Sequence, residues 1–303
     1  MQKKTEKAAG YIFLAFGCIA VVSVIAITVY MILKGTPALI KVGVPELLFG
    51  TVWKPTASEP QYGIFYIILS SIVGTLGAVL IGVPIGIMSA VFLTDYTSGS
   101  KMGRKLSKGL SAAVELLAAI PSVIYGLIGM MILNPFMYKL EKMIFAGNPN
   151  HQFTGGANLL SAIIVLAIMI LPTVINISAS SIRAIPDSMR SASLALGASK
   201  MQTIFKVVLP AAKSGIMTGV VLGIGRALGE AMAINMVAGG SVNIPLPFNS
   251  VRFLTTQLVS EMSYASGLHR QVLFTVGLVL YVFIVLINLF LTKLKKKGEI
   301  ENG

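Results

Sequence analysis

Residues 157–181 read ANLLSAIIVLAIMILPTVINISASS, and this run contains no charged side chain. A helix needs about 20 predominantly apolar residues to cross the hydrocarbon core of a bilayer, so the run is long enough to span a membrane. Five other stretches have the same character, with little or no charge across their middles: 9–33, 63–94, 109–134, 214–239 and 269–292. The sequence therefore predicts an all-α membrane protein with six transmembrane helices.

The composition supports the same class of protein. The chain has 303 residues, of which 55% are hydrophobic and only 12% are charged, whereas a soluble domain has about 25% charged residues. Because Cys18 is the single cysteine, an internal disulfide framework and a cysteine-based zinc cluster are both excluded. His151 and His269 fall near loops or helix ends, and we expect both to be solvated or interfacial, because a metal site needs several clustered ligands.

The distribution of basic residues predicts how the chain is oriented. If the N-terminus is cytoplasmic, the cytoplasmic segments hold 16 of the 24 lysines and arginines, and the outer segments hold 7. Cytoplasmic loops are enriched in positive charge, so both termini are predicted to be cytoplasmic. The same bias accounts for the net charge of +13 without a nucleic-acid partner. The expected division is a cytoplasmic N-terminus (1–8), a transmembrane domain (9–295) and a cytoplasmic tail (296–303).

Two further segments bear on how the chain sits in the membrane. The apolar run from Tyr11 to Leu33 is longer than the roughly 7–15 residues of a signal-peptide core, so we interpret it as a retained first helix. Residues 136–145 place apolar side chains at helical spacing beside charged ones, which predicts a short amphipathic helix at the outer interface. That helix either caps a pathway or only packs at the interface.

The cytoplasmic loop 182–213 has the pattern of two helices separated by a turn. Pro186 and Asp187 form a helix-start signal, since an aspartate can accept hydrogen bonds from the free N–H groups of a first turn. Gly197 is expected to take a positive φ between the helices, and Pro210 to end the second helix. The apolar face of the second helix comprises Met201, Ile204, Phe205, Val208 and Leu209. Such a face should be covered, either by the protein's own membrane face or by a groove on a soluble partner.

This loop is similar to the signature loop of binding-protein-dependent ABC importer permeases. The signature reads Glu-Ala-Ala, three residues, Gly, nine residues, Ile, one residue, Leu-Pro. The chain matches its spacing with the following residues: Ser191, Ala192, Ser193, Gly197, Val207, Leu209 and Pro210. Ser191 replaces the family's glutamate, so the chain lacks that carboxylate. The resemblance implies that the first helix docks into a cleft of a cytoplasmic ATPase and transmits its closure to the membrane helices.

Arg226 and Glu230 are charged residues within the predicted span 214–239. An intramembrane charge costs about 2.5–3.5 kcal/mol on insertion scales, and two opposite charges four residues apart on a helix can pair and reduce that cost. One interpretation is a structural ion pair that fixes the helix position. The other is that Arg226 faces a hydrated path and meets a passing anion, while Glu230 holds it in place between transport events. The guanidinium fork suits phosphate oxygens.

Four other polar residues lie within the predicted spans. Glu115 is near the inner end of the third span, where it either snorkels to the interface or lines the inner mouth of a pathway. Ser122, Tyr125 and Asn235 are polar groups in apolar helices, and each donates a hydrogen bond either to an anion or to a neighbouring helix. All four are candidate residues of a substrate pathway.

Several segments resemble the phosphate-specific permeases of the PstC type. They are LFGTVWKP (48–55), AIPSVIYG (119–126), IMILPT (168–173) and GRALGE (225–230). The likeness covers about residues 10–292 and implies a multi-pass protein of a bacterial or archaeal cell membrane. It further implies a phosphate importer in which this chain forms a heterodimer with a PstA-type permease, together with two PstB-type ATPases and an external PstS-type phosphate-binding protein.

The chain has no nucleotide-binding signature of its own. No G-x-x-x-x-G-K-[ST] phosphate loop occurs in the sequence, so ATP and magnesium are assigned to the partner ATPase and no cofactor is expected in this chain. Gly223, Gly225 and Gly229 lie in an apolar helix without a preceding strand. With Gly215 and Gly219, they suit close helix packing better than dinucleotide binding.

Two other classes of function are alternatives to a permease. An ion-coupled secondary anion carrier would use Arg226 and Glu230 as a charge relay, and transport by the chain alone, driven by an ion gradient, would favour it. A membrane-embedded enzyme is disfavoured, because the sequence offers no Ser-His-Asp, Cys-His or metal constellation. The leading hypothesis is therefore a non-catalytic permease subunit of an ATP-driven phosphate importer.

Overall fold

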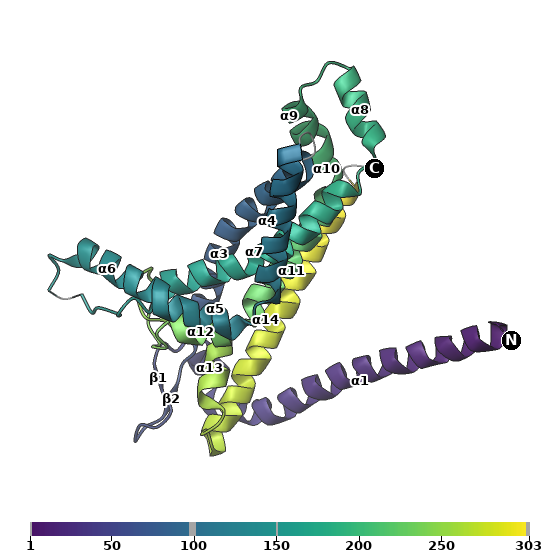
Figure 1. The fold of residues 1–303 in the computed structure, drawn as a ribbon. Helices are drawn as coiled ribbons and strands as arrows, with labels where there is room; N and C mark the ends of the chain where they lie inside the picture. Colours follow the sequence, from purple (N-terminus) through teal and green to yellow (C-terminus); the bar gives the residue numbers. More distant parts are fainter. Residues whose placement is uncertain (1, 97–100, 150, 301–303) are drawn as a thin grey trace.

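The computed structural model describes residues 2–96, 101–149 and 151–300, and this part of the chain is almost entirely helical (Figure 1). The α-helices are α1 (Gln2–Val42), α2 (Val44–Phe49), α3 (Phe65–Val91), α4 (Lys101–Ala119), α5 (Ser122–Ile128), α6 (Asn134–Phe145), α7 (Leu159–Arg183), α8 (Asp187–Ala195), α9 (Lys200–Thr203), α10 (Leu209–Ala211), α11 (Lys213–Gly229), α12 (Met232–Val237), α13 (Leu254–Glu261) and α14 (Gly267–Ile300). The other elements are an antiparallel hairpin, β1 (Trp53–Lys54) with β2 (Gln61–Tyr62), and the π-helical turns η1 (Phe92–Tyr96), η2 (Gly129–Leu133) and η3 (Ile204–Val208).

Helix α7 is the most buried of the long apolar helices, and α3 and α11 pack along it. Small residues allow the close approach of these helices. A Cβ added at Gly82 of α3 would lie 2.7 Å from Cδ1 of Ile170, and one added at Gly223 of α11 would lie 3.1 Å from Cγ2 of Val174. The three helices therefore form one tightly packed unit in which a displacement of one must shift its neighbours.

The structure confirms the predicted class of fold. In the described part of the chain, five helices are long and apolar enough to cross a membrane, and a sixth span results if one bent pair of helices is counted as a single span. Four of these helices contain most or all of a span expected from the sequence, namely 9–33, 63–94, 157–181 and 269–292. Uncharged apolar runs of this length were therefore sufficient to locate them.

The predicted third span, 109–134, is wrong as a single helix. Helix α4 ends at Ala119, and Pro121 has an extended backbone with a φ of −58° and a ψ of 142°. The break follows because proline has no N–H for the helix ladder and disfavours helical geometry in Ile120 before it. The helix that is long and apolar enough to cross a membrane here runs instead over 122–145.

The predicted fifth span, 214–239, is also broken. Helix α11 ends at Gly229, and Glu230 has an extended backbone with a φ of −74° and a ψ of 129°. A second bend, of 69°, separates α11 from the helical stretch Lys200–Ala211. Non-helical backbone at membrane depth is tolerated where it is buried in protein or lines a hydrated cavity, so these breaks mark positions of functional interest.

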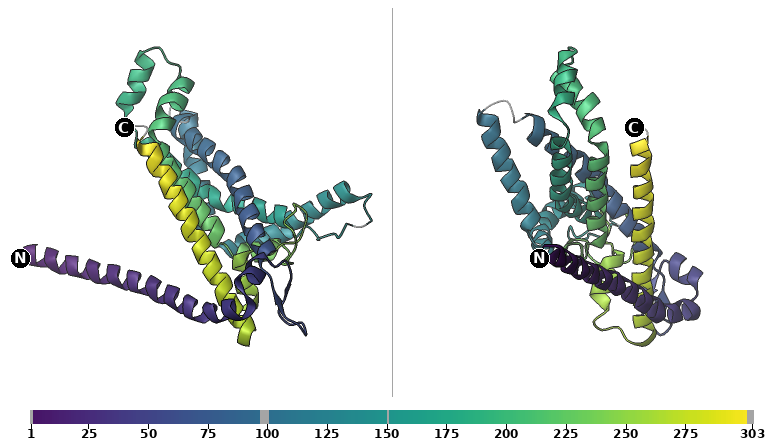
Figure 2. Two further views of the ribbon diagram at one scale, coloured as in Figure 1. Left: turned by 180° about the vertical axis from the view of Figure 1, so that it is seen from behind. Right: turned by 90° about the vertical axis from the view of Figure 1, so that its right-hand side faces the viewer.

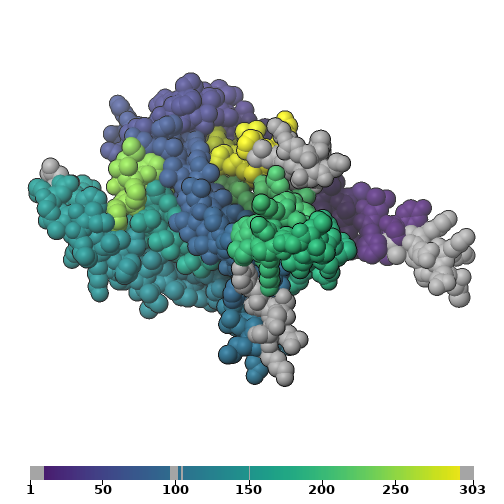
Figure 3. Space-filling view, turned by 90° about the horizontal axis from the view of Figure 1, so that it is seen from above, coloured from purple at the N-terminus to yellow at the C-terminus, as the bar shows by residue number. Residues whose placement is uncertain are grey.

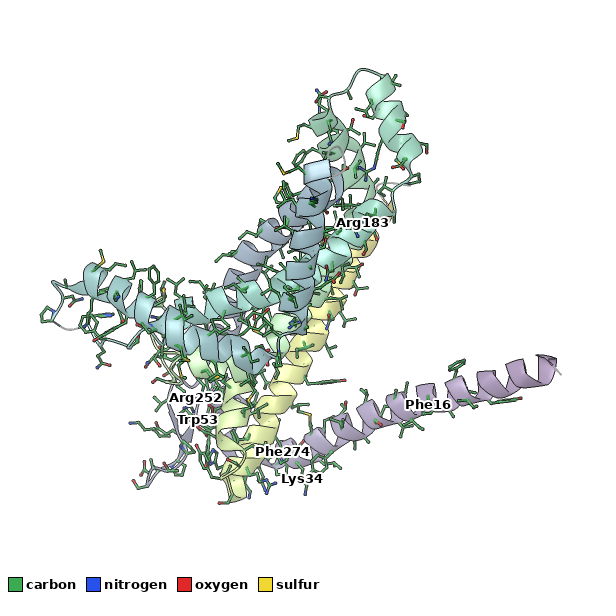
Figure 4. The ribbon with its side chains drawn as sticks, in the orientation of Figure 1. Phe16, Lys34, Trp53, Arg183, Arg252 and Phe274 are labelled. Carbon is green, nitrogen blue, oxygen red and sulfur yellow. The ribbon has the colours of Figure 1, made fainter. Side chains whose placement is uncertain are left out.

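Helix α1 leaves the rest of the bundle at an angle (Figure 1, Figure 2). It joins α14 near its own C-terminal end, where Oγ1 of Thr275 donates to the carbonyl oxygen of Gly35 over 2.8 Å. Most of its apolar side chains are exposed in the single chain, and Phe16 is one of them (Figure 4). In a membrane, such a surface is covered by lipid or by another protein chain.

The bundle has two distinct ends. The end called here the α8 end holds α8, α9, η1 and the C-terminal part of α14, and Figure 3 looks onto it. The opposite end, called the hairpin end, holds β1, β2 and α13. Figure 4 shows Trp53 and Arg252 together at the hairpin end and Arg183 at the α8 end.

The predicted terminal segments are continuous with the outermost helices. The expected cytoplasmic N-terminus, 1–8, belongs to α1 from Gln2 onward. The expected tail, 296–303, belongs to α14 as far as Ile300. Residue 1 and residues 301–303 lie outside the described part of the chain.

Candidate functional site

The two broken spans meet in the largest apolar cluster of the molecule, where α5 packs against α12. A Cβ added at Gly126 would lie 2.9 Å from Cα of Ala233, and one added at Gly129 would lie 2.6 Å from Cγ1 of Val237. These glycines let the two short helices approach closely. The backbone breaks that precede α5 and α12 are thereby brought into one region of the protein.

Arg226 lies on α11 one turn before the second break and is half-buried. Its guanidinium acts electrostatically on the phenol of Tyr125 on α5, so the two side chains share this region. Within residues 2–96, 101–149 and 151–300, Arg226 has neither an ion pair nor a hydrogen bond from its guanidinium. Taking a charge out of water without a partner is costly, so this cation is suited to an anion supplied from outside the chain.

The helix face around Arg226 is open in the single chain. A Cβ added at Gly225 or Gly229 would meet no atom within 4 Å, and Leu222 is 52% exposed. These four positions share one face of α11, because they repeat at helical spacing. The prediction that Gly225 and Gly229 serve close helix packing is therefore wrong within this chain. The remaining three glycines of the set do pack against α7, namely Gly215, Gly219 and Gly223.

Glu230 does not pair with Arg226. The backbone N–H of Ala233 donates to Oε1 of Glu230 over 3.0 Å, so the carboxylate caps the start of α12. Oγ1 of Thr255 donates to the carbonyl oxygen of Glu230 over 2.7 Å. The expected pairing fails because α11 stops at Gly229, and residues four apart share a face only while the helix continues.

Tyr125 forms a hydrogen bond across the break at Pro121. It is buried, and its hydroxyl donates to the carbonyl oxygen of Leu117 over 2.7 Å. That carbonyl lies four residues before Pro121, which has no N–H to donate to it. The tyrosine supplies a donor in place of the missing one, beside a longer contact of 3.3 Å from the N–H of Ile120. Of the two interpretations left open for Tyr125, this contact favours the bond to a neighbouring helix. Ser122 is half-buried at the first residue of α5.

Glu115 and Asn235 are exposed in the single chain. Oγ of Ser260 donates to Oδ1 of Asn235 over 2.9 Å, which connects α12 to α13. Glu115 lies on α4, one turn before its C-terminal end. Their assignment to a substrate pathway, like that of Ser122, stays a prediction.

At the α8 end, the structure contains the expected helix–turn–helix. Gly197 has a φ of 85°, a left-handed conformation that residues with a Cβ rarely adopt. Helix α8 buries none of its side chains, and both Ser191 and Ala192 of the matched signature are exposed. Ser193 is held by a contact of 2.9 Å between its Oγ and Oγ1 of Thr203. The surface of α8 is therefore open to a partner.

The second helix of the loop is covered by the chain on one side only. Ile204 and Val208 are buried in a cluster with residues of α3 and α7. Met201 and Phe205, in contrast, are 47% and 44% exposed. The chain's own bundle therefore covers one half of this apolar face. The other half is exposed and is open to a partner.

Pro210 does not end this helix, contrary to the expectation from the sequence. Helical geometry continues to Ala211, and the bend follows at Ala212. The preceding residues form the π-helical turn η3, which changes the hydrogen-bond pairing just before a residue that has no N–H. Of the other signature positions, Val207 and Leu209 are half-buried and Pro210 is exposed.

Three charged residues at the α8 end were missed by the sequence reasoning. Asp95 is buried in η1 and forms an ion pair with Arg190 of α8. Nζ of Lys200 donates to the carbonyl oxygen of Asp95 over 2.7 Å. The three residues help to line a hollow of about 600 Å³. A signal was present, because Asp95 is the only acidic residue between Glu59 and Glu115.

A cluster around Glu261 at the hairpin end was also missed. The buried carboxylate accepts from Nε1 of Trp53 over 3.1 Å and from Nη1 of Arg252 over 2.5 Å. Nε2 of His269 lies 2.7 Å from its other oxygen, and His269 is only 8% exposed. His269 is therefore not solvated, because segments far apart in the sequence enclose it, while its location near the membrane interface stays a prediction.

Residues 136–145 are helical within α6, but α6 continues a longer helix over Ser122–Phe145, so they do not form a separate short helix. The location at the outer interface stays a prediction. The second histidine contacts α6. Nε2 of His151 lies 2.9 Å from Oε1 of Glu141, a fully buried carboxylate of α6. The backbone N–H of Thr154 also donates to Oε1 over 3.0 Å. In the part of the chain that the structure describes, no group of three or more His, Cys, Asp and Glu residues is arranged to hold a metal ion. The expected absence of a resident cofactor stays a prediction.

Fold and site together define a multi-pass helical membrane protein with a cation on an open helix face and an exposed helix at one end. Residues 82–297 match the model of the family described as binding-protein-dependent transport system inner membrane component. The chain belongs to this family. It is thus a permease subunit of an ABC importer in the inner membrane, a transport subunit and not an enzyme.

Relatives in sequence cover most of the chain. The probable ABC transporter permease protein YqgH of Bacillus subtilis (strain 168) is 37% identical, over 94% of this chain and 89% of its own length. The phosphate transport system permease proteins PstC of Xylella fastidiosa (strain 9a5c) and Haemophilus influenzae are 33% and 31% identical, over 93% and 84% of this chain and 88% and 83% of theirs. The resemblance to PstC-type permeases is therefore confirmed.

Solved structures share the fold. A chain of a bacterial alginate ABC transporter, crystallised with an alginate-bound periplasmic protein, gives a TM-score of 0.64 over 95% of this chain and 94% of its own length, at 14% identity. A chain of the inward-facing MetNI methionine ABC transporter gives a TM-score of 0.54 over 78% and 94%, at 23% identity. At these identities the likeness concerns the fold alone.

Proposed function

We propose that this chain is one of two permease subunits of an ATP-driven phosphate importer and forms half of its translocation pathway. Relatives named as phosphate transport permeases support phosphate as the substrate. The observation that carries the proposal is the half-buried guanidinium of Arg226, which lies on an open helix face without an ionic partner among the described residues.

Phosphate suits this guanidinium because the planar fork of donors matches two oxygens of a tetrahedral oxyanion. Two opposite unit charges 4 Å apart attract by about 4 kcal/mol at an effective dielectric constant of about 20. Glu230 does not offset that attraction, since its carboxylate caps α12 instead. Arg226 is only partly buried in the single chain, and a hydrated path beside it would allow the release that a conduit requires.

The open face of α11 supports a second permease chain beside this one. An arginine facing lipid at the centre of a bilayer is costly, so the face that carries Arg226, Gly225 and Gly229 should be covered by protein or water. A related chain of the PstA type, in a heterodimer, would cover it and leave a hydrated path between the two. Ser122, Tyr125, Glu115, Glu230 and Asn235 are proposed to line or to brace that path.

The α8 end, which holds the C-terminal part of α14, is proposed to face the cytoplasm. The N-terminus is proposed to lie on the same side, as the distribution of basic residues predicts. There α8, with its unburied side chains, docks into a cleft of one of two PstB-type ATPases, which bind ATP and magnesium. The hairpin end then faces an external PstS-type phosphate-binding protein. Closure of the ATPases moves α8, and the helices reopen toward the outside to accept phosphate.

The test is ATP-driven phosphate uptake by the assembled complex in proteoliposomes. Arg226→Ala is expected to lower uptake at least tenfold while the complex still assembles. Arg270→Ala, which removes an exposed arginine from α14, is the matched control and should transport like the unaltered protein. Unchanged uptake by the Arg226→Ala complex would dismiss the anion site. Uptake by this chain alone, driven by an ion gradient, would instead establish a secondary carrier.

A further inference from the structure

Helix α8 is attached to the bundle by polar contacts. It buries no side chain, so apolar packing does not hold it in place. Arg190 forms the ion pair with Asp95, and its Nη2 donates to the carbonyl oxygen of Ile182 at the end of α7 over 3.0 Å. Ser193 adds its hydroxyl contact with Thr203. The position of α8 relative to the membrane helices therefore depends strongly on Arg190.

Asp95 is the point at which these contacts converge. It lies in η1, directly after α3, and is only 5% exposed. Its carboxylate pairs with Arg190 and accepts from Oγ1 of Thr94 over 3.0 Å, which orients it. Its carbonyl oxygen accepts from Nζ of Lys200 at the start of α9. Asp95 thus holds both helices that flank the Gly197 turn to the end of α3.

The ion pair between Asp95 and Arg190 lies beside a hollow at the α8 end. Asp95, Arg190 and Lys200 line the hollow of about 600 Å³ beside α8, and α8 itself buries no side chain. A buried ion pair with additional hydrogen bonds resists displacement, because a charge that loses its partner there is left incompletely solvated. A pull on α8 therefore reaches η1 and α3 through the ion pair, beside the contacts of α8 with Ile182 and Thr203.

We propose that Asp95 is a positioning residue that transmits the movement of α8, through Arg190, to the inner end of α3. From α3 the displacement reaches α7 and then α11, because these three helices pack closely along their lengths, and α11 carries Arg226. The inference rests on the proposed coupling of α8 to an ATPase. It adds a second mechanical connection to the covalent one through the loop.

The experiment compares ATP hydrolysis with phosphate uptake by the assembled complex in proteoliposomes, for Asp95→Asn, Arg190→Gln and the double variant. Each single variant is expected to keep at least half of the ATP hydrolysis, while uptake falls at least fivefold, so that more ATP is consumed per phosphate. The double variant should be no worse than either single one, because both changes remove the same link.

Asp187→Asn is the matched control. Asp187 also lies near Arg190, at 3.8 Å from its Nε, but its side chain is 99% exposed and it belongs to α8 itself. Its loss removes one negative charge beside Arg190 without detaching α8 from α3. The ratio of ATP hydrolysed to phosphate taken up should therefore stay at the value of the unaltered complex.

Two results would overturn the proposal. One is a proportional loss of hydrolysis and uptake in the Asp95→Asn complex, with an unchanged ratio, since Asp95 would then only stabilise the loop. The other is a double variant whose loss equals the product of the two single losses. If the Asp95→Asn complex fails to assemble, the proposal is tested with Arg190→Gln and Arg190→Lys, by the same ratio of ATP hydrolysed to phosphate taken up. If the unaltered complex shows no ATP-driven uptake, the proposed function itself fails, and this is seen before any variant is compared.

Discussion

Replacing Gly126 with alanine is predicted to force α5 away from α12. A Cβ at this position would lie 2.7 Å from Sδ of Met236 and 2.9 Å from Cα of Ala233, whereas ordinary contact begins at 3.4 Å. The methionine side chain can move, but Ala233 belongs to the backbone of α12. That helix would have to retreat by about 0.5 Å, in the region where Glu230 and Arg226 are placed.

The expected cost follows from two opposing terms. Inserting a methyl group into a packed core costs about 1–3 kcal/mol, and the better helix propensity of alanine returns at most about 1 kcal/mol. With the full offset, the net loss relative to the unaltered chain is up to about 2 kcal/mol, which changes the ratio of folded to unfolded chain by up to roughly 30-fold. Valine at position 126 should cost more, because its larger side chain would have to displace α12 further.

The assay is a titration of the purified chain in mixed micelles with a denaturing detergent, followed by far-ultraviolet circular dichroism. Gly109→Ala is the matched control, because Gly109 is also helical but a Cβ there would meet no atom within 4 Å. It should unfold at the same detergent concentration as the unaltered chain, or at a slightly higher one. A Gly126→Ala chain as stable as the Gly109→Ala chain would refute the close contact of α5 with α12.

Three further outcomes are expected. Glu261→Gln should lower the melting temperature of the purified chain. The loss of the buried carboxylate leaves Arg252 without its ionic partner, at a cost of about 1–3 kcal/mol. An unchanged melting temperature would contradict this role. Gly197→Val should uncouple ATP hydrolysis from phosphate uptake, because a φ of 85° costs a residue with a Cβ about 1–2 kcal/mol. Gly197→Asn should retain coupling. Normal coupling in the valine variant would count against docking through this loop. Burial raises the pKa of Tyr62, so its phenol should ionise later than a free tyrosine in an ultraviolet titration, and Tyr62→Phe should lower the late-titrating signal by the amount of one tyrosine. Because the folded chain then holds this proton more tightly than the unfolded chain, stability should fall as the pH rises above about 10, and a Tyr62 that titrates like a free tyrosine would refute the burial effect.

The positions of the long helices were predictable because hydropathy is a local property. The uncharged run 157–181 corresponds to α7, which is shifted by only two residues at each end. The helical turn at Gly197 was predictable for a similar reason, since only glycine adopts a positive φ at little cost. Such features depend on a few neighbouring residues and on the general requirements of a bilayer.

The breaks were only partly predictable. A proline in an apolar run can interrupt a helix, and the structure contains an interruption at Pro121. Pro84 and Pro172, in contrast, lie inside the continuous helices α3 and α7, so the residue type alone did not decide which proline breaks a span. At Glu230, however, the residue type gives no such signal, and contacts from Thr255 and from the backbone of Ala233 accompany the non-helical conformation. The expected pairing of Glu230 with Arg226 failed for this reason, because it assumed a continuous helix.

The sequence by itself determined the class of this protein, the approximate location of its spans and the helical loop that matches an importer permease. Those conclusions need only composition, periodicity and spacing, which act over one or two helical turns. Only the tertiary structure decided which charges meet. Asp95 pairs with Arg190, which lies 95 residues away in the sequence, and Glu261 accepts a hydrogen bond from Trp53, which lies 208 residues away. Arg226 has no ionic partner in the described chain. Pairing at such separations is set by how the helices pack. Side-chain contacts act over a few ångströms in space, and the order of residues along the chain does not show which side chains come that close.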